Sequence, residues 1–168
     1  MRHNPGYKDC DMVAFVELMD WANHVVPELL GLSTTDTLTI LNPDNVQHYK
    51  EQTGQGVWRF YKLQGNEVTI QPYPVLLART LDGHAAFMLV TDWILNQALD
   101  QKLPLWLHHG LVEYMGEDGT HLVNYMGEFR AAGPVLFSPP LVDGILAKGV
   151  DPDDGADREN FRRASYSA

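Results

Sequence analysis

Histidine and carboxylate side chains occur at a helical spacing in one apolar stretch of the chain. His109 and Glu113 are four residues apart, so in a helix both side chains lie on the same face. His84 lies in an earlier apolar stretch, GHAAFML, which also has helical spacing. Two imidazoles and one carboxylate are a ligand set that binds zinc. We therefore treat His84, His109 and Glu113 as the candidate metal-binding residues.

A structural role is the competing interpretation of the same residues. A lone histidine on an apolar helix is more often half-buried and hydrogen-bonded than a metal ligand, and His84 has no second histidine four residues away. Glu113 can likewise serve as a hydrogen-bonding residue. The sequence therefore favours a chain without a cofactor, and zinc held by His84, His109 and Glu113 is the alternative.

The segment LPLWLHHGLVEY, residues 103–114, resembles a motif of the gluzincin zinc metallopeptidases, also called peptidase MA-like families. In those families one helix carries HExxH and a later helix opens with a pattern close to PxWLxEGLAEY. Seven residues match that second pattern: Pro104, Trp106, Leu107, Gly110, Leu111, Glu113 and Tyr114. His109 occupies the position of the family's metal-binding glutamate.

The HExxH helix of this resemblance can be aligned in two ways. The preferred alignment sets Thr80, Leu81 and His84 against the first His, the catalytic Glu and the second His. The second alignment makes His84 the first His and sets Ala85 at the Glu and Met88 at the second His. Both place an aliphatic residue where the family's general base takes a proton from zinc-bound water.

Losing that base costs on the order of 100-fold to 10,000-fold in rate. The resemblance therefore implies a zincin-like fold without the peptidase mechanism, in which Thr80 and Leu81 are degenerate catalytic positions.

Periodicity and turn residues predict the order of the elements. Gln64, Gly65 and Asn66 separate two β-rich runs, which predicts a hairpin. Gly83 is the one interruption in the predicted helix over 74–99, which corresponds to the active-site helix of the resembling families. Helices are predicted over 11–30, 42–54, 74–99 and 104–115, in pieces of 121–148 and from Arg158, and strands over 37–42, 57–63 and 67–73.

These elements predict an α+β fold, in which a sheet of three to four strands packs on the helix over 74–99 and mostly helices follow. We expect one zincin-like domain over residues 1–168. The final residues SYSA fall inside a predicted helix, which suggests a truncated C-terminus. The aromatic residues Trp93, Trp106 and Tyr114 are expected in the core.

Composition limits the class of protein. The chain has 168 residues, 45% of them hydrophobic, a formal net charge of -10 and a pI near 4.9. This acidity argues against nucleic-acid binding, which needs clusters of Lys and Arg. No apolar run is long enough to span a membrane. The single cysteine, Cys10, and an N-terminus without a signal-peptide core predict a soluble, cytoplasmic protein.

The preferred functional interpretation is a catalytically inactive, metallopeptidase-like domain with a peptide-binding or structural role. Peptidases of this kind bind substrate as an added strand along a sheet edge, and the run VWRFYKL, residues 57–63, is a candidate for such a strand. Its aromatics are also explained by packing on the long helix. The alternative function is a metal-dependent hydrolase with a reduced site at His84, His109 and Glu113. The sequence leaves the partner and the oligomeric state open.

Overall fold

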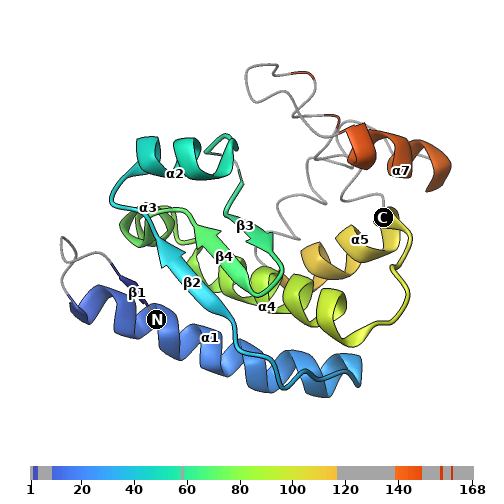
Figure 1. Cartoon of the computed structure of the whole chain (residues 1–168), viewed down its shortest axis with the longest axis horizontal. Helices are drawn as coiled ribbons and strands as arrows, with labels where there is room; N and C mark the ends of the chain where they lie inside the picture. The colour runs from blue at the N-terminus through green and yellow to red at the C-terminus, as the bar shows by residue number, and fades with distance from the viewer. Residues whose placement is uncertain are drawn as a thin grey trace. The chain divides into compact units, whose positions relative to one another are not determined.

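The computed structural model describes residues 2–3, 9–57, 59–116, 139–148, 156 and 160, and these form six helices and four strands. The elements are drawn in Figure 1. By backbone contacts the chain divides into two compact units, Met1–Lys102 and Leu103–Ala168, and each has its own architecture. None of the described helices is long and apolar enough to cross a membrane. The predicted α+β class is confirmed.

The first unit contains a mixed sheet in the order β1-β2-β4-β3. The strands are β1 (Arg2–His3), β2 (Thr39–Asn42), β3 (Tyr61–Gln64) and β4 (Glu67–Ile70). β1, β2 and β4 run parallel to one another, whereas β3 is antiparallel to β4. The three predicted strands are present but shorter than predicted, and β3 lies at one edge of the described sheet.

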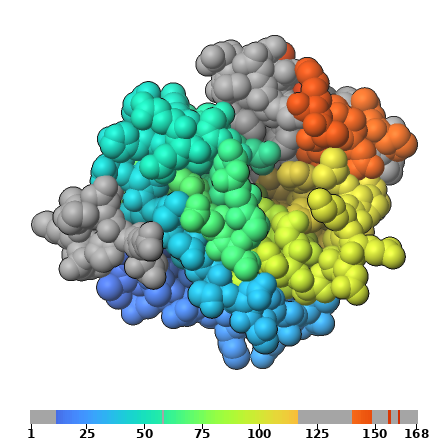
Figure 2. Space-filling model, viewed as in Figure 1, coloured from blue at the N-terminus to red at the C-terminus, as the bar shows by residue number. Residues whose placement is uncertain are grey.

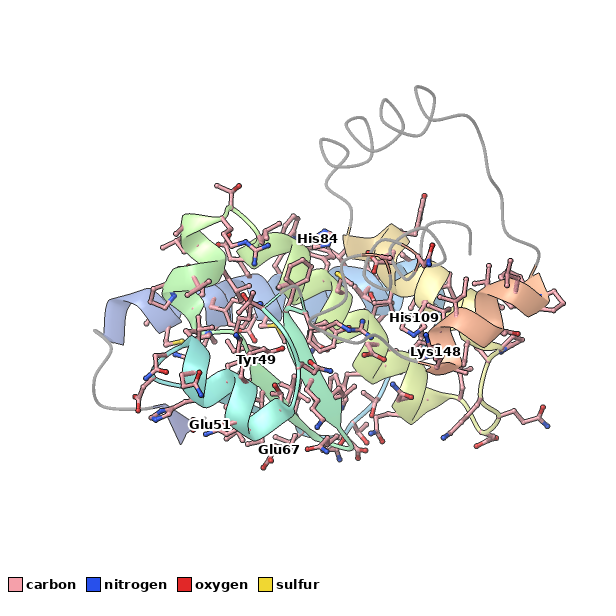
Figure 3. All side chains as sticks on the ribbon, turned by 90° about the horizontal axis from the view of Figure 1, so that it is seen from above. Tyr49, Glu51, Glu67, His84, His109 and Lys148 are labelled. Atoms are coloured by element: carbon pink, nitrogen blue, oxygen red, sulfur yellow. The ribbon has the colours of Figure 1, made fainter. Side chains whose placement is uncertain are left out.

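Four helices of the first unit surround this sheet. They are α1 (Asp9–Leu30), α2 (Val46–Thr53), α3 (Tyr73–Ala78) and α4 (Asp82–Ala98). α1 and α4 pack along each other on one face of the sheet, and α2 lies on the other face (Figures 1 and 3). Pro27 lies inside α1 without ending it.

The core of the first unit lies between the sheet and α1, α3 and α4. Phe15 of α1 meets Tyr73 at the start of α3, with ring centroids 5.4 Å apart. Buried Asn42 at the end of β2 accepts a hydrogen bond from the Tyr73 backbone N–H at 3.1 Å, which satisfies a donor at the start of α3. Fully buried side chains from these elements complete the core: Val26, Val68, Ile70, Leu76, Leu89 and Ile94.

The predicted hairpin is confirmed, and the helix predicted over 42–54 is present but begins at Val46. Gly65, at the first position of the β3–β4 turn, has a φ of 59°, a conformation that glycine adopts without strain. Asn45 caps α2 by accepting a hydrogen bond from the His48 backbone N–H at 3.0 Å. Gly54, with a φ of 67°, ends the same helix.

The predicted continuous helix over 74–99 is wrong, because the chain breaks between α3 and α4. Thr80 has a φ of 53°, in the left-handed region. The Leu81 N–H bonds the Leu76 carbonyl at 3.0 Å and the Thr80 N–H bonds the Leu77 carbonyl at 3.0 Å, the two bonds of a Schellman helix end. Leu76 and Leu81 are both buried, and their burial stabilises the break.

The second unit contains α5 (Leu105–Gly116) and α7 (Pro139–Lys148). Asp143 of α7 accepts a hydrogen bond from the Trp106 backbone N–H at 2.8 Å, and so caps the first turn of α5. Tyr114 is 71% exposed, so its predicted core position is wrong. The helical pieces predicted over 121–138 lie outside the described residues, as does the helix predicted from Arg158 except for Asn160.

Candidate functional site

His84 lies in the first turn of α4, and this N-terminal end of the helix is close to the residue that precedes β3. Its ring meets the Phe60 ring edge-on, with centroids 5.2 Å apart and an interplanar angle of 87°. The residue is half-buried. His84 is thus packed against the residue that directly precedes β3.

Further along α4, the same helix face contacts β3 through Tyr61. The Tyr61 hydroxyl lies 3.0 Å from the Asp92 carboxylate and 3.3 Å from the Met88 carbonyl oxygen. His84, Met88 and Asp92 are spaced by four residues, which places them along one side of α4. This α4 face, defined by His84, Met88 and Asp92, therefore lies against the edge strand.

The break before α4 separates the two alignments of the HExxH pattern. Thr80 and Leu81 precede α4, and Thr80 is exposed in a left-handed conformation. Positions 80 and 84 therefore do not share one helix face, which a pair of zinc-binding histidines at i and i+4 requires. Positions 84 and 88 both lie within α4. Of the two alignments, the one running from His84 to Met88 falls on a continuous helix.

His109 and Glu113 are one turn apart on α5, as their spacing predicts, and both are half-buried. The His108 and His109 rings lie 6.1 Å apart at their centroids. His84 belongs to the first unit and His109 to the second (labelled in Figure 3). Among the residues that the structure describes, no three His, Cys, Asp or Glu side chains form a group that could hold a metal ion.

Gln71 organises the segment that leads into β3, and sequence reasoning missed it. Its side chain is fully buried, and its amide nitrogen donates to the carbonyl oxygens of Val57 and of Arg59, the latter at 2.7 Å. The Arg79 guanidinium donates to the Val57 carbonyl at 3.2 Å and lies 3.5 Å from the Gln71 side-chain oxygen. Its place between the apolar run of β4 and Pro72 gives no sign of these partners, which lie 12 and 14 residues earlier.

Tyr49 of α2, labelled in Figure 3, contacts the same segment through its hydroxyl. Its hydroxyl lies 3.0 Å from the Arg59 carbonyl and 3.1 Å from the Gln55 side-chain oxygen. Burial raises the pKa of the Tyr49 phenol well above its usual value, and the nearby positive charge of Arg59 offsets only part of that rise. Tyr49 and Gln71 together bond the carbonyl groups of the segment that precedes β3, those of Val57 and Arg59.

No model of a known protein family matches the chain, and neither a curated protein sequence nor a solved structure matches it. The gluzincin resemblance therefore rests on the residues of its two sequence motifs alone.

Proposed function

We propose that the chain is a non-catalytic, zincin-like domain that binds an extended peptide as an added strand along β3. One observation carries the proposal: β3 is the antiparallel edge strand of the described sheet and lies against the α4 face that carries His84. Peptides bind such edges through main-chain hydrogen bonds, which require no particular peptide sequence. The resembling peptidases hold their substrates in this way.

The register of β3 indicates which backbone groups a peptide would meet. The Gln71 N–H donates to the Phe60 carbonyl at 2.7 Å, so 60/71 is a hydrogen-bonded pair of the ladder. Pairs alternate along an antiparallel ladder, so 62/69 and 64/67 are also bonded while Leu63 and Val68 form a non-bonded pair. The N–H and C=O of Leu63 therefore point away from β4, toward an added strand. Figure 2 shows β3, in green, at the molecular surface.

The edge strand is held in place before any peptide binds. The Tyr61 hydroxyl hydrogen-bonds the Asp92 carboxylate of α4. The Lys62 ammonium donates to the Thr53 carbonyl, at the end of α2, at 2.7 Å. Gln71 and Tyr49 fix the preceding segment, as described above. A strand that is ordered beforehand loses little conformational entropy on binding, which favours its use as a template.

The absence of catalysis is proposed from the residues at the mechanistic positions. In the alignment that falls on one helix, Ala85 stands where a general base is needed and is buried. Alanine cannot accept a proton from an attacking water. A peptide bound along β3 would therefore be retained without cleavage.

The test uses a displayed library of random decapeptides selected against the purified protein. Selected peptides should bind the wild-type chain and lose binding when alternate residues are N-methylated, because alternate amides of an added strand donate to β3. Leu63→Pro removes the outward N–H of β3 without removing a bond to β4, and should weaken binding at least about tenfold. Leu63→Ala is the matched control, since it keeps the N–H and should bind within about twofold.

Two results would contradict the proposal. One is a library that yields no peptide with periodic sensitivity to N-methylation. The other is equal binding by Leu63→Pro and Leu63→Ala, with circular dichroism showing that both variants are folded.

A metal-dependent hydrolase is the second candidate, favoured by His109 and Glu113 lying one turn apart on α5. Zinc bound by His109 and Glu113 would activate a water without an adjacent base. The protein would then retain stoichiometric zinc after dialysis, measured by mass spectrometry, and His109→Ala would lose it. If the wild-type protein retains no zinc, or if His109→Ala retains as much zinc as the wild type, this metal site is contradicted.

A further inference from the structure

Beside its buried side, α1 carries an apolar stripe that is only partly covered by the rest of the first unit. The stripe consists of Ala14, Leu18, Trp21, Val25 and Leu29, spaced by four, three, four and four residues. At 3.6 residues per turn these positions fall within an arc of about 80°. The buried side of α1 is made by other residues, including Phe15, Ala22 and Val26. Such spacing is typical of a seam that receives a second helix.

The stripe is open along most of its length. Trp21 is 57% exposed and Leu29 is 67% exposed, although large apolar side chains are usually buried. The Trp21 ring packs edge-on against Phe87 of α4, with centroids 5.0 Å apart and an interplanar angle of 83°. Phe87 therefore restricts the orientation of the Trp21 side chain. Tryptophan is one of the residue types that contribute most binding energy at protein interfaces.

Charge indicates what kind of helix would dock on this stripe. α1 contains no Lys or Arg, and its carboxylates are Asp9, Asp11, Glu17, Asp20 and Glu28. Glu17 and Glu28 are exposed and border the stripe on its solvent side. His24, an exposed neighbour, lies 3.9 Å from Glu28. α4, which packs on α1, also lacks Lys and Arg and adds Asp82 and Asp92.

We infer that the α1 stripe is a docking surface for a basic amphipathic helix of a partner protein. Leucine-like residues of that helix would cover Leu18, Trp21 and Leu29, while Lys or Arg beside them would meet Glu17 and Glu28. This surface is separate from the β3 edge. A second copy of the chain would bring carboxylates against carboxylates, and an anionic membrane would repel them, so both fit poorly.

The probe is a fluorescein-labelled, three-heptad peptide with leucine at the two core positions and lysine elsewhere. Fluorescence anisotropy should show binding to the whole chain, and a peptide with glutamate in place of lysine should not bind. Glu17→Lys/Glu28→Lys should weaken binding about tenfold. Glu51→Lys/Glu67→Lys changes the net charge equally at exposed sites outside α1, and should have less than about a threefold effect.

Apolar contact is tested separately. Leu29→Ser should weaken binding about tenfold, whereas Leu77→Ser, at an exposed leucine of α3, should not. Equal loss in both charge variants would mean unspecific attraction to an acidic protein, and would overturn the inference. Concentration-dependent dimerisation abolished by Leu29→Ser would overturn it in favour of a second copy. Binding of phosphatidylserine vesicles abolished by Leu29→Ser would overturn it in favour of a membrane.

Discussion

Two helices of the first unit, α2 and α3, end in the same left-handed conformation but with different residues. Gly54 follows α2 with a φ of 67°, and Thr80 follows α3 with a φ of 53°. Glycine adopts this region freely, whereas a β-branched residue there is strained by contact of its Cβ with the neighbouring backbone. The end of α3 therefore holds a conformation that its own residue disfavours.

Different contacts hold these two ends. At α2 the Lys62 ammonium and the Gln55 N–H bond the carbonyl and hydroxyl of Thr53, so polar contacts surround a relaxed glycine. At α3 the two Schellman bonds and the buried pair Leu76 and Leu81 hold the strained threonine. Burial thus overrides local preference at the point where α4 begins. This point also determines which residues share a helix with His84.

Replacing the relaxed residue should have the largest effect. Gly54→Val places a β-branched residue in a left-handed conformation and should lower the free energy of unfolding by about 2 kcal/mol. No heavy atom lies within 4 Å of the added Cβ position, so the expected loss comes from the backbone and not from a clash. Urea denaturation followed by circular dichroism measures it. An unchanged midpoint would show that α2 can end elsewhere.

Relaxing the strained residue should have the opposite and smaller effect. Thr80→Gly should raise the free energy of unfolding by about 1 kcal/mol, because relief of roughly 1 to 2 kcal/mol exceeds the entropy that glycine loses on folding. Thr80→Ala is the control, since alanine keeps a Cβ and should change stability by less than about 0.5 kcal/mol. Equal stabilisation by both would mean that the side chain, and not the left-handed backbone, is the source of strain.

This contrast also explains how far the sequence predicts the fold. Asn45, Gly54 and Gly65 can be recognised from the sequence alone. Asn45 caps a helix with its own side chain, and the two glycines adopt a positive φ without strain. Thr80 gives no such signal, and Gly83 is a misleading one because it lies inside α4. The break depends on the burial of Leu76 and Leu81 in the core, which is a tertiary effect.

The candidate site divides in the same way. The spacing of His109 and Glu113 is local and predicts that they lie one turn apart, which the structure has. The position of β3 at the sheet edge depends on strand order, which one sequence does not state. The role of Gln71 depends on carbonyl groups 12 and 14 residues away along the chain, so its residue type alone could not reveal it.

The smallest effect concerns Tyr49, whose backbone carbonyl accepts from the Thr53 hydroxyl at the end of α2. Burial raises the pKa of its phenol, so the folded chain keeps this proton at pH values where the unfolded chain, with a pKa near 10.0, loses it. Stability from Tyr49 is therefore complete below pH 10 and declines as the pH rises above it. At pH 10.5 the decline should be about 0.8 kcal/mol.

Tyr49→Phe isolates this contribution from the other titrating groups. At pH 7 the variant should be less stable by about 1 kcal/mol, because the one hydroxyl proton that lies between the Arg59 carbonyl and the Gln55 oxygen is removed. The difference between wild type and variant should then shrink between pH 9 and pH 10.5, measured by urea denaturation at each pH. A difference that stays constant would mean that the phenol ionises equally in both states, so that burial does not keep it neutral.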